Sequence, residues 1–378
     1  MAKGKKKKKG KKKRDAEHAE KKHAGGGKPK TKKAKASEAK AKAGKAKREE
    51  KRQAKRARSA GKPDRAAQAK KAKVARDEAV ARAKLAAKKG GPPDLYALFE
   101  SIHYREFKIL LKAQDFSGDV GADVADYWRL AREVAKQLLI GIQPSPRAAV
   151  AQRRSIVFLD TPDGELYRRS LMLRIRSPFV GERPGPAYEL TLKFRSPDIA
   201  AAASVDVNAT PKYGGVPKFK EELLLTHSAL GGMRSVFSHT CQLKEQSAPL
   251  GSTVGDFAKI FPILGTLGLS PKKRLAPAAP VPVEEVLYDL GLFGFRGGRS
   301  AKVNMAVWRR GDTGEVMIGE FAYETHFRHY GKLHPHPKLR SERYYRLLQR
   351  ETGAWVDLGS TKTALYYGLA GKKIDHDE

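Results

Sequence analysis

Seven short segments between residues 104 and 325 alternate charged or polar side chains with apolar ones. The clearest of them, Tyr188 to Arg195, has the sequence YELTLKFR. Because successive side chains of a β-strand point to opposite faces, this pattern predicts a sheet with one apolar face and one charged face. The predicted strands are Tyr104 to Lys112, Arg154 to Asp160, Leu171 to Arg176, Tyr188 to Arg195, Lys218 to Leu225, Lys302 to Arg309 and Glu315 to Thr325.

The charged faces of these strands carry more bases than acids. An ordinary antiparallel sheet can turn its charged face to water, but such a face normally mixes the two signs. An excess of bases suits a closed barrel whose interior binds a polyphosphate, with carboxylates holding a divalent cation on one side. The alternation alone leaves both interpretations open. The bases are Lys108, Lys112, Arg174, Arg176, Lys193, Arg195 and Lys220, and the acids are Glu106, Glu189, Glu222, Glu320 and Glu324.

Helices are predicted at three places around these strands. Apolar residues recur at helical spacing from Ala122 to Ile140, and a charged helix is expected from Lys338 to Arg350. A short apolar helix, LYALFESI, follows the Gly-Gly-Pro-Pro sequence at residues 90–93. The Pro-rich stretch from Ser270 to Val283 is expected to be an extended connector.

Three of the strand segments resemble the CYTH, or triphosphate tunnel metalloenzyme, superfamily. Residues 104–108 (YREFK) are similar to the family's first-strand motif ExExK, residues 157–176 contain FLDTP followed by LMLRIR, and residues 190–195 read LTLKFR. The resemblance is good over residues 104–196 and extends less closely to about residue 325. It implies an α+β fold, in which an antiparallel β-barrel forms a triphosphate tunnel with helices at its periphery.

The resemblance also implies a function, which is metal-dependent binding and hydrolysis of a triphosphate or polyphosphate. Glu106 and Lys108 would then be catalytic, with Lys108 beside the reacting end of the phosphate chain. The expected substrate-binding residues are Arg174, Arg176, Lys193, Arg195 and Lys220. The expected ligands of a Mg²⁺ or Mn²⁺ cofactor are Glu106, Glu320 and Glu324.

The sequence departs from the family motif at Tyr104, which stands where the first glutamate of ExExK would be. This change removes one oxygen ligand from the expected metal site. It favours an alternative in which the domain is catalytically silent and only binds polyphosphate or a nucleotide. A third alternative is a nucleic-acid-associated protein that acts mainly through its N-terminal residues.

Residues 1–93 differ in composition from the rest of the chain. They contain 37 Lys or Arg, nine Asp or Glu and no aromatic residue, which gives a net charge of +28 out of +36 for the whole chain. Such a segment cannot bury enough apolar surface to offset the entropy of ordering it, so we expect a disordered basic tail before a folded domain at 94–378. The tail is expected either to bind nucleic acid or polyphosphate without sequence preference or to act only as a solubilising segment.

The single cysteine, Cys241, excludes a disulfide framework and favours a reducing cytoplasm. No apolar run is long enough to cross a membrane as a helix, so no membrane partner is expected.

Overall fold

The computed structural model describes residues 95–116, 118–146, 152–246, 250–295, 300–327, 335–359 and 361–371. The predicted basic tail, residues 1–93, lies outside the described residues. The helices are α3 (Leu95–Glu100), α4 (Val120–Gln137), α5 (Ile199–Ser204), α6 (Val254–Ile260), α7 (Pro335–Glu351) and α8 (Lys362–Gly368). The strands are β1 (Tyr104–Leu111), β2 (Gly141–Pro144), β3 (Gln152–Asp160), β4 (Leu171–Val180), β5 (Arg183–Pro184), β6 (Tyr188–Ser196), β7 (Val216–Leu224), β8 (Arg234–Gln246), β9 (Ala276–Pro277), β10 (Val283–Gly294), β11 (Ser300–Arg310) and β12 (Val316–His326).

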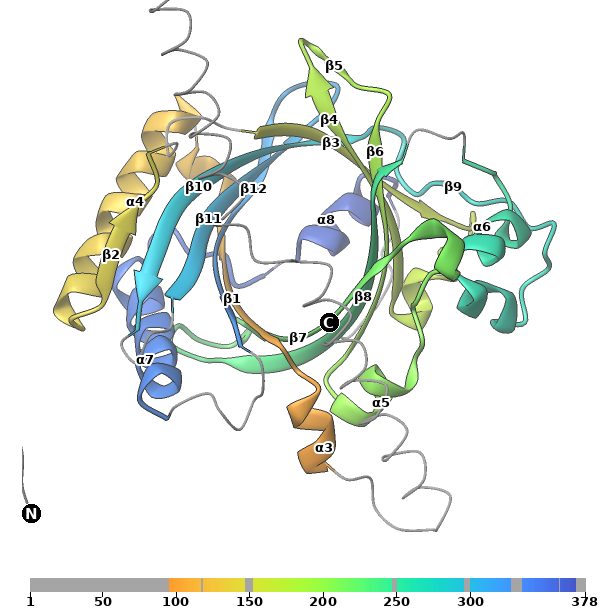
Figure 1. The fold of residues 1–378 in the computed structure, drawn as a ribbon. Coiled ribbons are helices and arrows are strands. Elements are labelled where there is room, and N and C mark those ends of the chain that lie inside the picture. Colours follow the sequence, from red (N-terminus) through yellow and green to blue (C-terminus); the bar gives the residue numbers. More distant parts are fainter. Residues whose placement is uncertain are drawn as a thin grey trace, which may run out of the picture. The chain divides into compact units, whose positions relative to one another are not determined.

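Nine of these strands form a sheet that closes on itself (Figure 1). Their order is β10-β11-β12-β1-β7-β8-β6-β4-β3, and β3 pairs again with β10. The predicted α+β class is confirmed, and this pairing provides the closure that a barrel requires. One expectation is corrected, because β1 and β7 pair in parallel whereas the other pairs of the ring are antiparallel. More than 100 residues separate these two strands, so no hairpin constrains their relative direction.

All seven predicted strands are present, but two long strands of the ring were not predicted. In β10 the residues buried from solvent do not alternate, because they include the neighbouring pairs Glu285–Val286 and Leu290–Gly291. In β8 the sequence SHTCQ places polar residues on both faces of the strand. Neither strand therefore shows the period of two on which the prediction rested.

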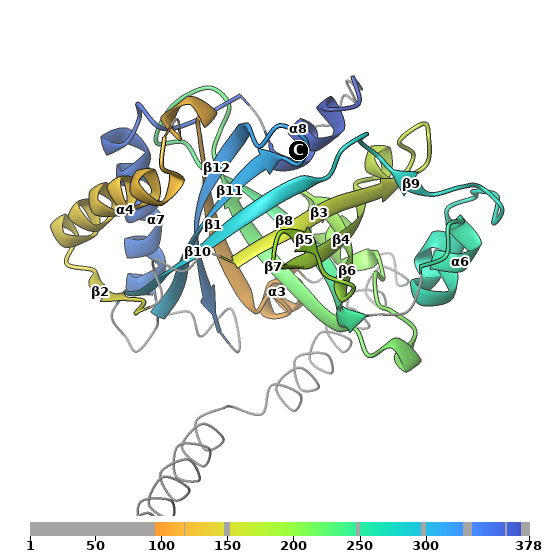
Figure 2. The ribbon, with the colours of Figure 1, turned by 90° about the horizontal axis from the view of Figure 1, so that it is seen from above.

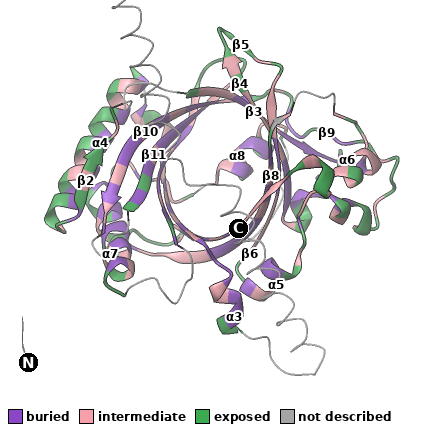
Figure 3. Ribbon diagram, in the orientation of Figure 1, coloured by how far each residue is buried: buried purple, intermediate pink, exposed green. Residues whose placement is uncertain are grey.

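The apolar faces of the strands point outward and are covered by helices. On β1, Phe107, Ile109 and Leu111 are buried, and they belong to a core that also includes residues of α4 and α7. The side chain of Asp119 accepts a hydrogen bond from Gly121 N at 2.8 Å and thereby caps α4. Figure 2 shows α4 and α7 side by side on one outer flank of the ring, and Figure 3 shows their mixture of buried and exposed residues. Because the helices cover the apolar outer face of the sheet, its charged face points into the interior of the ring.

The short helix α8 appears within the outline of the ring in Figure 1, and the perpendicular view in Figure 2 shows that it lies at one end of the ring. Its Tyr366 and Tyr367 are buried with Phe158 and Trp308 in a separate apolar cluster. The hydroxyl of Tyr367 donates a hydrogen bond to Asp160 Oδ2 at 2.8 Å. These contacts fix α8 to the end of β3 and bring its first residues to the interior of the ring. Among the described residues, no helix is both long and apolar enough to cross a membrane.

Candidate functional site

The interior of the ring contains a cavity of about 280 Å³. Side chains from all nine strands of the ring line it, together with residues of α8 and of the segment before that helix. Ten bases and five acids line the cavity, so it carries a formal excess of five positive charges. The bases are Lys108, Arg154, Arg174, Arg176, Lys193, Arg195, Lys218, Lys220, Arg234 and Lys362, and the acids are Glu106, Glu222, Glu285, Glu320 and Asp357.

Three arginines from β3 and β4, which are Arg154, Arg174 and Arg176, line one wall of the cavity. Arg154 donates from Nε to Glu285 Oε1 at 2.6 Å, and Arg176 lies 3.7 Å from Glu189. Arg174 forms no ion pair with a described residue, and its buried Nε has no hydrogen-bond partner there. Burial, followed by the charge of Arg176, holds the pKa of the Arg174 guanidinium well below its usual range. A bound anion would satisfy Arg174 and reduce the repulsion among the three guanidinium groups.

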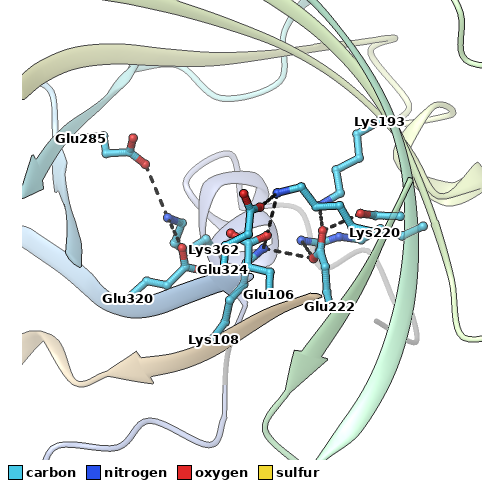
Figure 4. A network of polar contacts seen from close by, with 11 residues as sticks. Glu106, Lys108, Lys193, Lys220, Glu222, Glu285, Glu320, Glu324 and Lys362 are labelled. Atoms are coloured by element: carbon cyan, nitrogen blue, oxygen red, sulfur yellow. Dashed lines mark hydrogen bonds and ion pairs between the residues drawn. The ribbon is translucent and has the colours of Figure 1, made fainter. Parts of the chain in front are cut away.

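Glu222 on β7 is the centre of a second group of charges (Figure 4). Its side chain is 1% exposed and accepts hydrogen bonds from Lys108 at 3.1 Å, Arg195 at 3.1 Å and Ser238 at 2.7 Å, as well as one from Lys193. Burial alone would raise the pKa of Glu222, but the cations of Lys108, Lys193 and Arg195 hold it well below the ordinary carboxyl value. Glu222 therefore fixes three predicted site cations in place.

Lys220 bridges two carboxylates on neighbouring strands (Figure 4). Its Nζ donates to Glu106 Oε2 at 3.1 Å and to the carboxylate of Glu324. Lys108 approaches the same oxygen of Glu106 at 3.3 Å. Although burial lowers the pKa of the Lys220 ammonium, the two carboxylates raise it above its usual value, so Lys220 stays charged at neutral pH.

A third group joins α8 to the wall of the ring. Lys362 Nζ lies 2.9 Å from Glu320 Oε1 and 3.5 Å from Glu285 Oε2, and it stands 4.7 Å from the centre of the Trp308 ring. The indole Nε1 of Trp308 donates to Glu285 Oε2 at 2.8 Å. Lys362 thus places one more positive charge at the end of the cavity that α8 occupies.

Most predicted site residues line this one cavity. They are Glu106, Lys108, Arg174, Arg176, Lys193, Arg195, Lys220 and Glu320. Glu324 does not line it and reaches the site only through Lys220. The prediction missed Arg154, Glu285 and Lys362. Arg154 begins a predicted strand, so its charge was a usable signal, whereas Lys362 lies far beyond the strand motifs.

The structure places the three predicted metal ligands, Glu106, Glu320 and Glu324, at two different positions along the strands. Glu106 pairs with Glu324 across β1 and β12, but Glu320 lies opposite Leu110, four residues along β1 from Glu106. Four residues of strand span about 13 Å. Among the described residues, no three His, Cys, Asp or Glu side chains form a group that could hold a metal ion. The two carboxylates that do lie together, Glu106 and Glu324, are already paired with Lys220, so in the free protein these residues do not fit a resident divalent cation.

Comparison with known proteins found similarity at the level of structure. No family profile and no curated protein matches the sequence. HpAC1 from Hippeastrum, described as a candidate adenylyl cyclase with a dominant triphosphatase activity, matches with a TM-score of 0.36 and 14% identity over 72% of this chain and 98% of its own. A candidate adenylate cyclase from Bacillus halodurans matches with a TM-score of 0.29 and 13% identity over 69% of this chain and 97% of its own. The function of the cavity is therefore inferred from its own residues.

Proposed function

We propose that the cavity binds a linear triphosphate or a segment of polyphosphate. The observation that carries this proposal is the excess of five positive charges in the interior of the ring, with the buried Nε of Arg174 left without a partner among the described residues. The guanidinium of Arg174 has no carboxylate within ion-pair distance among the described residues and is repelled by the nearby charges of Arg176 and Arg154. A phosphate chain supplies several anionic oxygens that match the fork of arginine.

Calorimetric titration of the full-length protein with tripolyphosphate tests this proposal. Arg174→Ala should weaken binding by about 10- to 150-fold, as expected for loss of a charge-assisted contact worth about 1.5 to 3 kcal/mol. The matched control is Arg129→Ala on α4, which removes an exposed arginine that pairs with Asp126. All variants share the basic tail, and salt of about 200 mM suppresses its contribution. Equal affinities for wild type and Arg174→Ala would contradict the proposal.

Hydrolysis of the bound phosphate chain is the second candidate function. It is favoured by Glu106 and Lys108, which face the same cavity as the arginines and contact each other at 3.3 Å. Phosphate release from a panel of triphosphates, with Mg²⁺, with Mn²⁺ and with chelator, separates an enzyme from a binding module. Tight binding without release under every condition would leave only the binding function.

The basic tail is proposed to bind polyanions independently of the cavity. Its net charge of +28 lets it neutralise phosphates of DNA, RNA or polyphosphate without reading their sequence. This would hold the folded domain near polyanions and raise the local concentration of a phosphate ligand.

A reducing, cytoplasmic location is also proposed. Cys241 is buried and not part of a disulfide, so it packs as a small apolar side chain. Subcellular fractionation tests the location, and recovery of the protein from an oxidising compartment would contradict it.

A further inference from the structure

Two carboxylates lie side by side at the edge of the cavity, and only the first of them, Glu106, lines it. Glu106 on β1 and Glu324 on β12 occupy paired positions of adjacent strands. Their side chains are 16% and 26% exposed, so water screens them only partly. Two ionised carboxylates at neighbouring, half-buried positions repel each other unless a cation lies between them.

The cation between them is an ammonium group of the chain itself. Lys220 extends from β7, the strand on the other side of β1, and its Nζ contacts both Glu106 and Glu324 (Figure 4). Its backbone pairs with Tyr104, the residue that replaces the first glutamate of the ExExK motif. The ring of Tyr104 lies 5.5 Å from Lys220 Nζ, so an aromatic face borders the ammonium where a further carboxylate would have provided oxygen ligands.

The other ring-strand carboxylates that line the cavity also have cationic partners. Glu222 is held by Lys108, Lys193 and Arg195, while Lys362 pairs with Glu320 and Glu285. A divalent cation held by any of these carboxylates would have to displace an ammonium or guanidinium partner. The side chains therefore supply the positive charge that a metal would otherwise bring.

We propose that Lys220 permanently takes the place of a divalent cation between Glu106 and Glu324, so that the cavity binds its phosphate ligand without metal. This inference rests on the proposed function for the identity of the ligand. It has two consequences. Chelator should not affect binding, and Mg²⁺ should weaken it, because a phosphate chain complexed with Mg²⁺ offers less negative charge to the arginines.

The first test measures Mn²⁺ binding by electron paramagnetic resonance in the absence of phosphate. Wild-type protein is expected to bind Mn²⁺ at least tenfold more weakly than Lys220→Met, in which Glu106 and Glu324 lose their shared cation. The matched control is Lys218→Met, which removes an ammonium from the same strand and cavity but keeps Lys220, whose Nζ contacts Glu106 and Glu324. Lys218→Met should not gain a Mn²⁺ site.

Three results would overturn the inference. One is tight Mn²⁺ binding by wild type that Glu106→Gln abolishes. Another is a folded Lys220→Met variant with no gain in Mn²⁺ affinity. The third is wild-type binding of tripolyphosphate that requires Mn²⁺ and is lost in chelator. If Lys220→Met does not fold, Lys220→Gln replaces it, and the two wild-type measurements still decide the question.

Failure of this inference can be told apart from failure of the proposed function. The Mn²⁺ titrations contain no phosphate, so they report on Lys220 whether or not the cavity binds a triphosphate. Binding of tripolyphosphate only with Mn²⁺ would refute the role of Lys220 and keep the proposed function. No binding under any condition would refute the proposed function, and the Mn²⁺ measurements would still show what lies between Glu106 and Glu324.

Discussion

Arg174 on β4 lies directly opposite Thr191 on β6, and each has a buried polar atom without a hydrogen-bond partner among the described residues. The two atoms are Arg174 Nε and Thr191 Oγ1, and both residues line the cavity. Buried polar groups are nearly always satisfied in folded proteins. Two unsatisfied donors at paired positions of one wall indicate a place where a ligand supplies the acceptors.

Thr191→Val is expected to change stability and ligand affinity in opposite directions. Removing an unsatisfied buried hydroxyl should stabilise the free protein by on the order of 1 kcal/mol, because the desolvation cost disappears. Tripolyphosphate affinity should fall by about tenfold, because one donor to a charged ligand is lost. Denaturant unfolding and calorimetry measure the two effects. Thr240→Val, which alters another cavity residue, is the control, and a loss of stability in Thr191→Val would show that its hydroxyl already has a partner.

Stability should fall in acid because of Glu222. Its pKa in the folded protein is held below the ordinary carboxyl value of 4.5, so its stabilising contribution is complete above that pH and is lost as the pH falls through the lower, folded value. Glu222→Gln removes the charge that pairs with three buried cations and should cost about 3 to 5 kcal/mol at pH 7. Unfolding free energies between pH 3 and 7 should therefore vary less with pH in Glu222→Gln than in wild type. A parallel pH dependence in the two proteins would assign the acid sensitivity to other carboxyls.

Gly291→Ala should destabilise the protein strongly. Gly291 has a φ of +118°, and a Cβ there would lie 2.1 Å from Gln143 O on β2. We expect a loss of more than about 2 kcal/mol, because the strained backbone and the clash with another backbone act together. Gly368→Ala in α8 is the control, since its added Cβ meets nothing within 4 Å. Similar melting temperatures for both variants would contradict the close approach of β2 to β10.

Removing the basic tail should abolish most sequence-independent binding to DNA. Counterion release makes log K fall with log salt at about 0.9 per neutralised phosphate, so a tail that engages six phosphates loses about a thousandfold in affinity between roughly 50 and 200 mM salt. Electrophoretic shift assays with two unrelated DNA sequences, with and without residues 1–93, measure this. Unchanged affinity after truncation would show that the folded domain, and not the tail, binds polyanions.

The basic wall of the cavity could be predicted because the alternation along a strand determines which side chains lie on the same face. Arg174, Arg176, Lys193 and Arg195 follow a strict period of two, and all four line the interior. Alternation does not determine distance along a strand. Glu320 and Glu324 share a face, yet one pairs with Lys362 and the other with Lys220, so alternation predicts the shared face and not the partner of each carboxylate.

Other parts of the site depend on contacts that no local pattern contains. Lys362 enters the cavity because Tyr366 and Tyr367 anchor α8 against β3 and its neighbours, and these contacts join residues about 200 positions apart. Glu285 lies on a strand whose burial does not alternate, because structure packs against both of its faces. Such long-range packing overrides the periodicity on which a prediction from sequence depends.

The closure of the sheet also constrains the order in which the protein can fold during synthesis. β1 is among the first strands to leave the ribosome, yet its neighbour β12 lies more than 200 residues later in the chain. Until β12 emerges, one side of β1 has unpaired backbone groups next to the apolar residues that α7 will later cover, and such an edge can pair with another chain. Contacts between residues so distant in sequence form slowly. We therefore expect nascent chains that lack β12 to depend on chaperones and to aggregate when these are scarce.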